Sequence, residues 1–451
     1  MNKIFKKIPK IDIFICNNEF KGLNKELLTI AARYEIEKLR TKIKNETITD
    51  INISKLIHGV KITYAKFITP SLKPLINATG IIIHTNMGRS VISNEIIDKA
   101  KDIICGYSNL EYDEKTGKRG ERYTHVTKDL QNLLGVEDAL VVNNNASAVF
   151  LILNTFAKNK EVIVSRGELV EIGGSFRIPE VMRESGAILK EIGTTNKTKL
   201  KDYESNINQN SAILMKVHKS NFDIVGFSED VKFEDITKLA KKYNLLDYYD
   251  LGSAYILELP YNLGTKEPPI KKILSQQPSL ISFSADKLFG SVQAGIIIGK
   301  KSYIDKLKQN QLLRMLRVDK VTLSILQESI RAYILKEYNK IPTLKMLFTD
   351  TKELTNRAKA IKDKTKNDKC MIKNCFTYMG GGTLPNRKFP TVALAFKGNA
   401  EDLEQKFRNF GLIGRIENEQ FLIDFRSILP EMDNKIIDTI NKVFNSKEKI
   451  K

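Results

Sequence analysis

From residue 76 onward, short apolar runs alternate with longer stretches in which apolar residues recur at helical spacing. Most of the short runs are apolar throughout rather than at every second position, which is typical of strands buried on both faces of a sheet. The expected strands cover residues 139–142, 161–164, 188–192, 212–217, 244–250, 280–283 and 294–298. Strands that alternate with helices predict an α/β domain with a mostly parallel sheet and helices on both faces.

A long helical pattern over residues 301–340 ends near Pro342, and the elements after it are shorter. The pattern predicts helices at 343–364, 400–410 and 435–444, and strands at 371–379, 391–396, 414–416 and 421–425. This order of elements predicts a small α+β domain at the C-terminus. Pro70 and Pro74 mark a linker near the other end. We therefore expect a first domain over 1–68, a linker and large domain over 69–340, and a small domain over 341–451.

The first 68 residues predict a separate helical domain. Leu23, Leu27, Ala31 and Tyr34 recur at helical spacing, and lysines and arginines occupy the opposite positions. Residues 1–70 hold 14 Lys and Arg against 7 Asp and Glu, which is more than their share of the excess of +20 in the whole chain. Such a basic face is either a solvated helix surface or a surface that docks nucleic acid.

Composition narrows the classes of protein further. The strong positive charge favours polyanions such as nucleic acid or phosphate-bearing molecules, although a general richness in lysine accounts for part of it. The chain has no run of about 18 apolar residues, so no membrane span is expected. Four cysteines and four histidines lack the spacing of a metal site, so no metal is expected. We expect a reduced, cytoplasmic protein.

The chemistry is predicted to centre on Lys287, which follows the expected strand 280–283. A lysine at a strand end beside a cavity can be desolvated, which lowers its pKa and makes it a nucleophile and a base. We interpret Lys287 as the amine that binds pyridoxal phosphate covalently. Ser284, three residues earlier, can direct its hydroxyl at the cofactor phosphate. A lone lysine is usually a solvated surface charge, so this prediction depends on two upstream motifs.

The first upstream motif is the turn from Val142 into the helix predicted near Ala146. Small residues and a helix N-terminus let backbone N–H groups approach an anion. Asn145, Ala146 and Ser147 are therefore predicted to bind the cofactor phosphate, the alternative being an ordinary Asn-rich helix cap.

The second upstream motif is an aspartate in the strand 244–250. An aspartate in a buried strand is costly unless it is paired, and the protonated pyridine nitrogen of the cofactor is a suitable partner. Asp250 is the first choice for this partner and Asp247 the second, while a turn-capping role for Asp250 stays open. Phosphate turn, aspartate and lysine follow one another in the order used by enzymes of the aspartate-aminotransferase type, which is fold type I.

Arginines form a third group of candidates. Arg314 and Arg317 are three residues apart in the long helical pattern, a spacing that puts two guanidinium groups on one helix face. Such a pair suits a tetrahedral oxyanion, because arginine binds oxyanions in a bidentate way. Exposed surface arginines would have the same spacing.

Taken together, ten stretches resemble bacterial selenocysteine synthase, the L-seryl-tRNA(Sec) selenium transferase. They are residues 77–90, 106–112, 143–148, 166–179, 191–196, 250–253, 283–290, 316–322, 380–385 and 413–417. The resemblance covers nearly the whole chain, and residues 1–68 correspond to the family's tRNA-docking domain. Three small departures lie near the expected cofactor, at Ser147, Ala254 and the loop 289–293.

The resemblance implies a mechanism and a set of partners. Seryl-tRNA(Sec) would displace Lys287 from pyridoxal phosphate, lose its β-hydroxyl to give aminoacrylyl-tRNA, and accept selenium from selenophosphate to give selenocysteinyl-tRNA. The family's oxyanion site corresponds to Arg89, Arg314 and Arg317. The family also assembles as a ring of dimers, so a homodecamer, a pentamer of dimers, is implied.

Two other readings compete with this one. A pyridoxal-phosphate lyase or transferase for a small free amino acid would share Lys287, Asp250 and the phosphate turn, but would have no use for a basic N-terminal domain. A non-catalytic RNA-binding protein would use that domain and would bind no cofactor.

Overall fold

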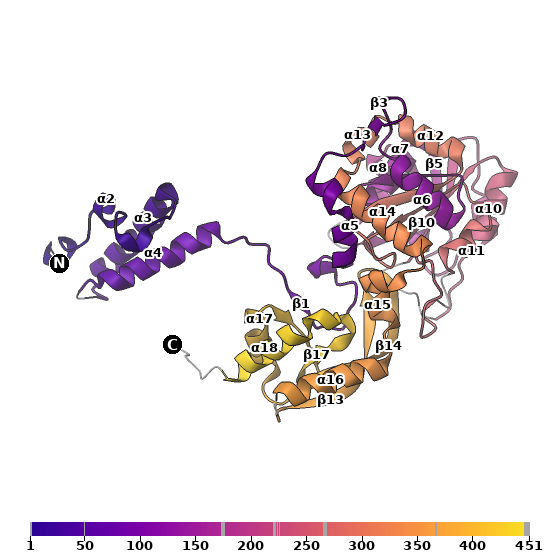
Figure 1. Cartoon of the computed structure of the whole chain (residues 1–451). Helices are drawn as coiled ribbons and strands as arrows, with labels where there is room; N and C mark the ends of the chain where they lie inside the picture. The colour runs from indigo at the N-terminus through magenta and orange to yellow at the C-terminus, as the bar shows by residue number, and fades with distance from the viewer. Residues whose placement is uncertain are drawn as a thin grey trace. The chain divides into compact units, whose positions relative to one another are not determined.

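The structure is a computed structural model that describes residues 2–48, 50–172, 176–219, 222, 224, 226–264, 268–365 and 368–445. Contacts between residues divide the chain into two units, Met1–Pro74 and Leu75–Lys451 (Figure 1). Each unit has its own hydrophobic core. No helix in the described ranges is long and apolar enough to cross a membrane.

The first unit is a small helical domain. Its two long helices are α3 (Lys25–Lys44) and α4 (Ile53–Ile68), and the short helices α1 (Asn2–Phe5) and α2 (Ile11–Phe14) precede them. Asn24 begins α3, because its side-chain oxygen accepts hydrogen bonds from the N–H groups of Glu26 and Leu27. The core contains Leu28, Ala31, Ile36, Val60 and Tyr64. Tyr34, which the helical pattern placed on the apolar face, is instead 60% exposed.

The second unit is built on a seven-stranded sheet with the order β4-β12-β11-β10-β9-β5-β8. The strands are β4 (Asp138–Val142), β12 (Gly295–Gly299), β11 (Leu280–Ser284), β10 (Leu246–Ser253), β9 (Ser211–Val217), β5 (Glu161–Ser165) and β8 (Ile188–Ile192). Only β12 runs antiparallel to its neighbours, and all other pairs in this sheet are parallel. The predicted mostly parallel sheet is therefore confirmed.

Helices cover both faces of this sheet, since neighbouring residues of one strand enter different cores. Tyr249 belongs to a core that also contains residues of α6 (Thr124–Leu134), α10 (Phe233–Lys242) and α14 (Lys320–Ile334). Tyr248 belongs to the core on the other face, which contains residues of α7 (Asn145–Phe156), α8 (Ile178–Glu184) and α12 (Lys301–Gln309). Alternate residues of one apolar strand therefore pack into the cores on opposite faces of the sheet, as expected of a sheet buried on both faces.

The long helix expected over 301–340 is interrupted. It consists of α12, α13 (Leu313–Leu316) and α14, and the chain is extended at Asn310 and Arg317 between them. The helix expected over 343–364 is also two helices, α15 (Pro342–Phe348) and α16 (Thr351–Thr365), separated by an extended Thr349. The apolar spacing continues through both breaks, which explains why the pattern did not reveal them.

A second, antiparallel sheet has the order β13-β14-β17-β16. Its strands are β13 (Cys370–Gly380), β14 (Thr383–Phe396), β17 (Gln420–Asp424) and β16 (Arg415–Glu417), packed with α16, α17 (Ala400–Asn409) and α18 (Asp433–Asn445). Beside it, β1 (Ile76–Asn77) pairs in parallel with β15 (Leu412–Ile413). The start of the second unit thus pairs with β15, a strand from the C-terminal part of the chain.

Shorter elements complete the second unit. They are α5 (Asn94–Cys105), α9 (Leu200–Glu204), α11 (Ile270–Leu274), and the two-stranded ribbons β2 (Tyr112–Asp113) with β3 (Lys118–Arg119) and β6 (Glu171–Ile172) with β7 (Phe176–Arg177).

Candidate active site

Lys287 lies in a turn directly after β11, and its side chain is buried. The residue is 5% exposed. Burial lowers the pKa of its amine, the nearby charge of Arg89 lowers it further, and Asp250 and Asp286 act in the opposite direction. The turn closes with a hydrogen bond from the Gly290 N–H to the Lys287 carbonyl oxygen (2.9 Å). The predicted lysine is thus held in a protected place where its amine loses a proton more readily than in water.

Gly290 is required at the end of this turn. Its φ of +74° lies in the left-handed region, and a Cβ there would come within 2.6 Å of Cγ2 of Ile341. Only glycine meets both conditions, so the turn after the lysine is defined by its sequence.

Asp250 lies in β10, beside the strand that leads to Lys287. Its Oδ1 accepts hydrogen bonds from Nδ2 of Asn145 (2.8 Å) and from the N–H of Gly252 (2.9 Å). Burial raises the pKa of this carboxyl group, and the hydrogen bond from Asn145 is the largest opposing influence, followed by the Gly252 N–H and the charges of Lys287 and His218. Asp250 and Lys287 therefore influence one another's ionisation within one buried site.

Asp247 lies elsewhere. Three residues along a strand reverse the direction of a side chain, so Asp247 points to the opposite face of the sheet from Asp250. There it accepts hydrogen bonds from the hydroxyls of Thr237 (2.9 Å) and Ser279 (2.6 Å) and from the N–H of Ser279 (3.2 Å). Of the two aspartates left open by the sequence, Asp250 is the one that shares a site with Lys287.

The Asn-rich turn connects β4 to the N-terminus of α7. Asn144 caps the helix, and its Oδ1 accepts a hydrogen bond from the N–H of Ser147 (2.8 Å). Asn145 directs its amide at Asp250, and its own Oδ1 is buried with no hydrogen-bond partner in the described residues. The helix N-terminus with Ala146 and Ser147 is where the sequence predicted it. The Asn145 side chain, however, contacts the aspartate carboxylate.

Arg89 and Ser284 are joined through an aspartate that sequence reasoning did not single out. Asp286 receives a hydrogen bond from the Ser284 hydroxyl (2.6 Å) and an ion pair from Nη1 of Arg89 (2.8 Å). The Ser284 proton is thus engaged by a neighbour, although the sequence suggested a phosphate partner. Asp286 directly precedes Lys287, and this adjacency was the one available signal for its importance.

Arg314 and Arg317 line a hollow of about 330 Å³, separate from Arg89. Arg317 is extended and bridges to Val142, so the two arginines do not share one continuous helix face, and that expectation was wrong. The other cations that line the hollow are Arg119, Arg122 and Lys308. Sequence reasoning assigned them no role.

The cations of this hollow are only partly neutralised. Glu111 accepts hydrogen bonds from Arg122, from Arg119 (3.0 Å) and from Nη1 of Arg317 (3.5 Å), so three arginines share this one carboxylate. Lys308 pairs with Asp138 (2.8 Å). The Arg122 hydrogen bond is the main reason that the pKa of Glu111 is lowered. A hollow with more arginines than carboxylates suits a small, multiply charged anion.

The buried residues fit pyridoxal phosphate. An amine of lowered pKa suits covalent attachment to an aldehyde, a buried carboxylate suits a protonated ring nitrogen, and the N-terminus of the twelve-residue helix α7 suits a phosphate. The unpaired Oδ1 of Asn145 beside Asp250 is a further polar atom for which the described residues supply no partner. No group of three or more metal-binding side chains occurs in the described part of the chain.

The fold, with a lysine after a central strand and an aspartate in the adjoining one, is that of the fold type I enzymes that use pyridoxal phosphate. A solved structure of a D-glucosaminate-6-phosphate ammonia-lyase is similar, with a TM-score of 0.58, 18% sequence identity, and coverage of 83% of this chain and 96% of that one. At this identity the likeness concerns the fold alone.

The sequence comparisons go further. A profile of the family described as L-seryl-tRNA selenium transferase matches residues 75–429. The L-seryl-tRNA(Sec) selenium transferase of Aliarcobacter butzleri is 56% identical over 447 residues, covering 98% of this chain and 99% of that protein. The protein of the same name from Nautilia profundicola is 54% identical, with 99% of both chains covered. This chain belongs to the L-seryl-tRNA selenium transferase family, and the family resemblance predicted from its motifs is confirmed.

Proposed function

We propose that this protein converts L-seryl-tRNA(Sec) to L-selenocysteinyl-tRNA(Sec), with pyridoxal phosphate as cofactor and selenophosphate as selenium donor. The observation that carries this proposal is the 56% identity to the transferase of A. butzleri over 98% of the chain, which includes both units. A match to a relative without the helical first unit would be equally compatible with an enzyme that acts on a free amino acid. The match to the A. butzleri protein includes this first unit.

The cofactor would be held by residues of one buried site. Lys287 would bind it covalently, Asp250 would face its ring nitrogen, and the N-terminus of α7 with Ala146 and Ser147 would receive its phosphate. When bound, pyridoxal phosphate supplies an electron sink that makes the Cα–H of the seryl group acidic. Nζ of Lys287, whose pKa is lowered by burial, is suited to accept that proton.

The selenium donor is proposed to bind among the arginines. Arg314 and Arg317 line the basic hollow, where the donor would bind, and Arg89 at the lysine turn would add a further positive charge beside the reacting group. Arg89 already pairs with Asp286, and a donor anion would compete with that carboxylate for it. Positive charge held in place before reaction stabilises an anion without reorganisation.

The wider assignments follow from the substrate. The basic face of Met1–Pro74 would hold the tRNA through its phosphates and shape. The protein would act in the cytoplasm, where charged tRNA is used. The homodecamer, a pentamer of dimers, is kept as the proposed assembly.

The test is turnover of seryl-tRNA(Sec) with selenophosphate by the full-length protein, with free serine as the competing substrate. We expect selenocysteinyl-tRNA from the wild type, none from Lys287→Ala, and a reduced rate from Arg314→Ala. Turnover of free serine but not of seryl-tRNA would favour the free-amino-acid enzyme. A purified protein with no visible absorbance after incubation with pyridoxal phosphate would favour the RNA-binding protein.

A further inference from the structure

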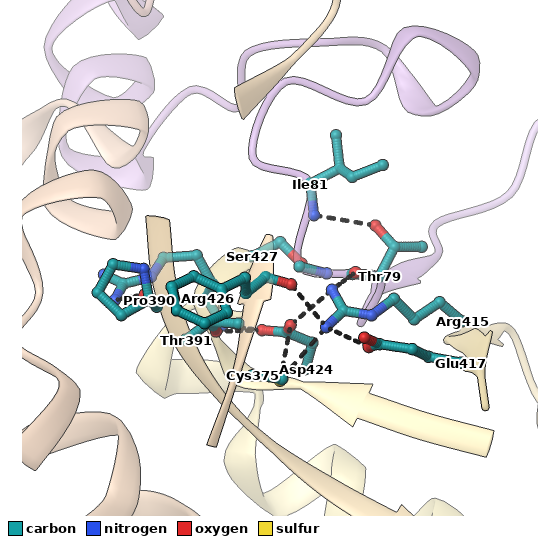
Figure 2. A network of polar contacts seen from close by, with 12 residues as sticks. Thr79, Ile81, Cys375, Pro390, Thr391, Arg415, Glu417, Asp424, Arg426 and Ser427 are labelled. Carbon is teal, nitrogen blue, oxygen red and sulfur yellow. Dashed lines mark hydrogen bonds and ion pairs between the residues drawn. The ribbon is translucent and has the colours of Figure 1, made fainter. Parts of the chain in front are cut away.

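The segment 77–90 connects the C-terminal sheet to the turn that carries Lys287. At its far end it is bound by a buried polar network on β16 and β17 (Figure 2). The Asp424 N–H donates to the Ala78 carbonyl oxygen, and Nη1 of Arg415 donates to the Thr79 carbonyl oxygen, both at 2.9 Å. Backbone atoms of two consecutive residues are thereby fixed to the sheet.

Ser427 adds a second pair of contacts at the same end. Its hydroxyl donates to the Asn77 carbonyl oxygen (2.8 Å) and accepts from the Gly80 N–H (2.9 Å). A Cβ on Gly80 would lie 2.4 Å from Oδ2 of Asp424, so the segment passes against this carboxylate as closely as a backbone can. Asp424 is fully buried and pairs with Arg415 at 2.8 Å, so the anchor consists of satisfied charges inside the sheet.

The middle of the segment is also fixed. The Asn77 side chain donates to the Ile81 carbonyl oxygen (2.8 Å), and the Ile83 N–H donates to the Met379 carbonyl oxygen (3.0 Å). A Cβ on Gly380 would come within 2.2 Å of the Ile81 side chain, which shows how closely the hairpin of β13 and β14 packs here. The described contacts leave little freedom between the anchor and His84.

At its near end the segment turns sharply and contacts the lysine turn. Gly88 and Arg89 both have positive φ, of 90° and 62°, a conformation that residues other than glycine rarely adopt. The Arg89 N–H donates to the His84 carbonyl oxygen (3.0 Å), which closes the turn. This turn directs the Arg89 side chain to the Asp286 carboxylate and places Ser90 against the backbone of Asp286 and Lys287.

Ser90 makes the decisive contacts. Its hydroxyl lies 2.8 Å from the carbonyl oxygens of both Asp286 and Lys287, and its N–H donates to the Asp286 carbonyl oxygen (3.2 Å). The hydroxyl itself lies within reach of Thr343, whose Oγ1 is 3.3 Å away. One serine therefore fixes the two peptide groups from which the Lys287 side chain begins.

We propose that Ser90 is a positioning residue that sets where the Lys287 amine lies, and that residues 77–90 are a strap through which the C-terminal sheet holds the lysine turn. This inference rests on the proposed role of Lys287. Ser90 contacts the backbone at Asp286 and Lys287 and not the Lys287 amine itself. It acts by fixing the backbone beneath the lysine, since small misplacements of a reacting group slow catalysis strongly.

The test compares four variants of the full-length protein. Ser90→Ala removes the hydroxyl, Ser90→Thr keeps it, and Ser427→Ala loosens the far anchor. Ser185→Ala is the control, because the hydroxyl of Ser185, the residue that directly follows α8, also donates to a backbone carbonyl oxygen; Ser185 is buried, whereas Ser90 is half-buried. Hydrogen exchange of the amides of residues 284–291 is measured without cofactor, and kcat and KM for seryl-tRNA are measured with it.

We expect Ser90→Ala to speed exchange in residues 284–291 and to lower kcat, each by about tenfold, the factor that corresponds to one lost hydrogen bond. KM for seryl-tRNA should stay unchanged, Ser90→Thr should restore both quantities, and Ser427→Ala should show the same pattern more weakly. Ser185→Ala should leave exchange at 284–291 and kcat as in the wild type.

The inference is overturned if Ser90→Ala leaves exchange at 284–291 unchanged, or if Ser90→Thr behaves like Ser90→Ala. It is equally overturned if Ser185→Ala produces the same changes. Exchange is measured without substrate, so it stays informative if the wild type fails to use seryl-tRNA. That failure would remove the proposed function and leave the structural role of Ser90 to be judged on exchange alone.

Discussion

The amide of Asn145 donates a hydrogen bond to the carboxylate of Asp250 across 105 residues of sequence (2.8 Å). This contact joins the Asn-rich turn before α7 to the strand beside Lys287. It also opposes the effect of burial, which raises the pKa of the aspartate.

Substitution of the two aspartates of β10 should have different effects, on activity for Asp250 and on stability for Asp247. Asp250→Asn should lower kcat by roughly 100-fold, because the amide cannot supply a negative charge to the cofactor ring. Asp247→Asn should leave kcat close to that of the wild type but lower the free energy of unfolding by about 1–3 kcal/mol, since its hydrogen bonds to Thr237 and Ser279 are buried. Kinetics and urea unfolding of both variants check this, and the reverse pattern would move the cofactor partner to Asp247.

Arg89 should control the ionisation of Lys287. Its positive charge lowers the pKa of the lysine, and Asp286, freed of Arg89, raises that pKa. Arg89→Gln should therefore shift the pKa of Lys287 upward. The rate at which cofactor-free protein combines with pyridoxal phosphate depends on the neutral amine, so its pH midpoint should move to higher pH. Arg314→Gln is the control, and an equal shift in both variants would contradict the specific role of Arg89.

At low pH, the buried Lys287 should lower the free energy of unfolding of the cofactor-free protein. The unfolded chain holds the lysine proton up to about its ordinary pKa of 10.5, whereas the folded chain releases it earlier. The unfolded state binds more protons in between, so stability rises with pH through this window, and the penalty is greatest below the folded pKa. Lys287→Met removes the penalty.

The Lys287→Met variant should therefore melt at a higher temperature than the wild type. The gain should be larger at about pH 7 than at about pH 10, which thermal unfolding of both proteins can measure. Lys238→Met is the control, because a hydrogen bond to Glu234 raises the pKa of Lys238 rather than lowering it. A gain for Lys287→Met that grows with pH would show that the sign is wrong.

The basic hollow should set affinity for the selenium donor. Arg314→Ala should raise KM for selenophosphate by about tenfold or more, since a charged hydrogen bond contributes about 1.5–3 kcal/mol, and should affect KM for seryl-tRNA less. Arg331→Ala, an exposed arginine on α14 that pairs with Glu328, is the matched control. Equal effects of both variants would mean that general positive charge, not the hollow, attracts the donor.

Two left-handed glycines test the lysine turn. Gly290→Ala should lower the free energy of unfolding more than Gly135→Ala, which should cost about 1 kcal/mol, because a Cβ at 135 meets nothing within 4 Å. The difference measures the contact with Ile341. Chemical unfolding of both variants gives this comparison, and equal losses would mean that the turn can move to admit a methyl group.

Much of the second unit could be predicted from local pattern. Most strands of the large sheet are largely apolar, a pattern that follows from burial of both faces, and the edge strand β8, with Lys190 and Glu191, is the exception. The choice between Asp247 and Asp250 could not be made in the same way. Both are aspartates of one buried strand, and the face that carries the site depends on where α7 packs. The position of an aspartate in the sequence does not tell which face of the sheet carries the site.

Contacts between residues distant in the chain could not be predicted from the sequence either. The pairing of Glu111 with Arg122 and Arg317 depends on tertiary structure, so the loop residues that line the hollow with Arg314 received no role. The break of the expected helix 301–340 was missed because Leu312, Leu313 and Leu316 continue the apolar spacing through it. Arg317 consequently lies in extended chain, where a helix was expected.

The attachment of the strap to β16 and β17 has a consequence for biosynthesis. Arg415 and Thr79 are 336 positions apart, so the ribosome must add nearly the whole second unit before the anchor can form. At about 5–20 residues per second, that interval is on the order of half a minute. Throughout it the nascent chain carries Arg89 and Ser90 without their final support. Truncations that remove Arg415, Asp424 and Ser427, or mutations of these residues, should therefore disturb the lysine turn, although these residues lie far from Lys287 in the sequence.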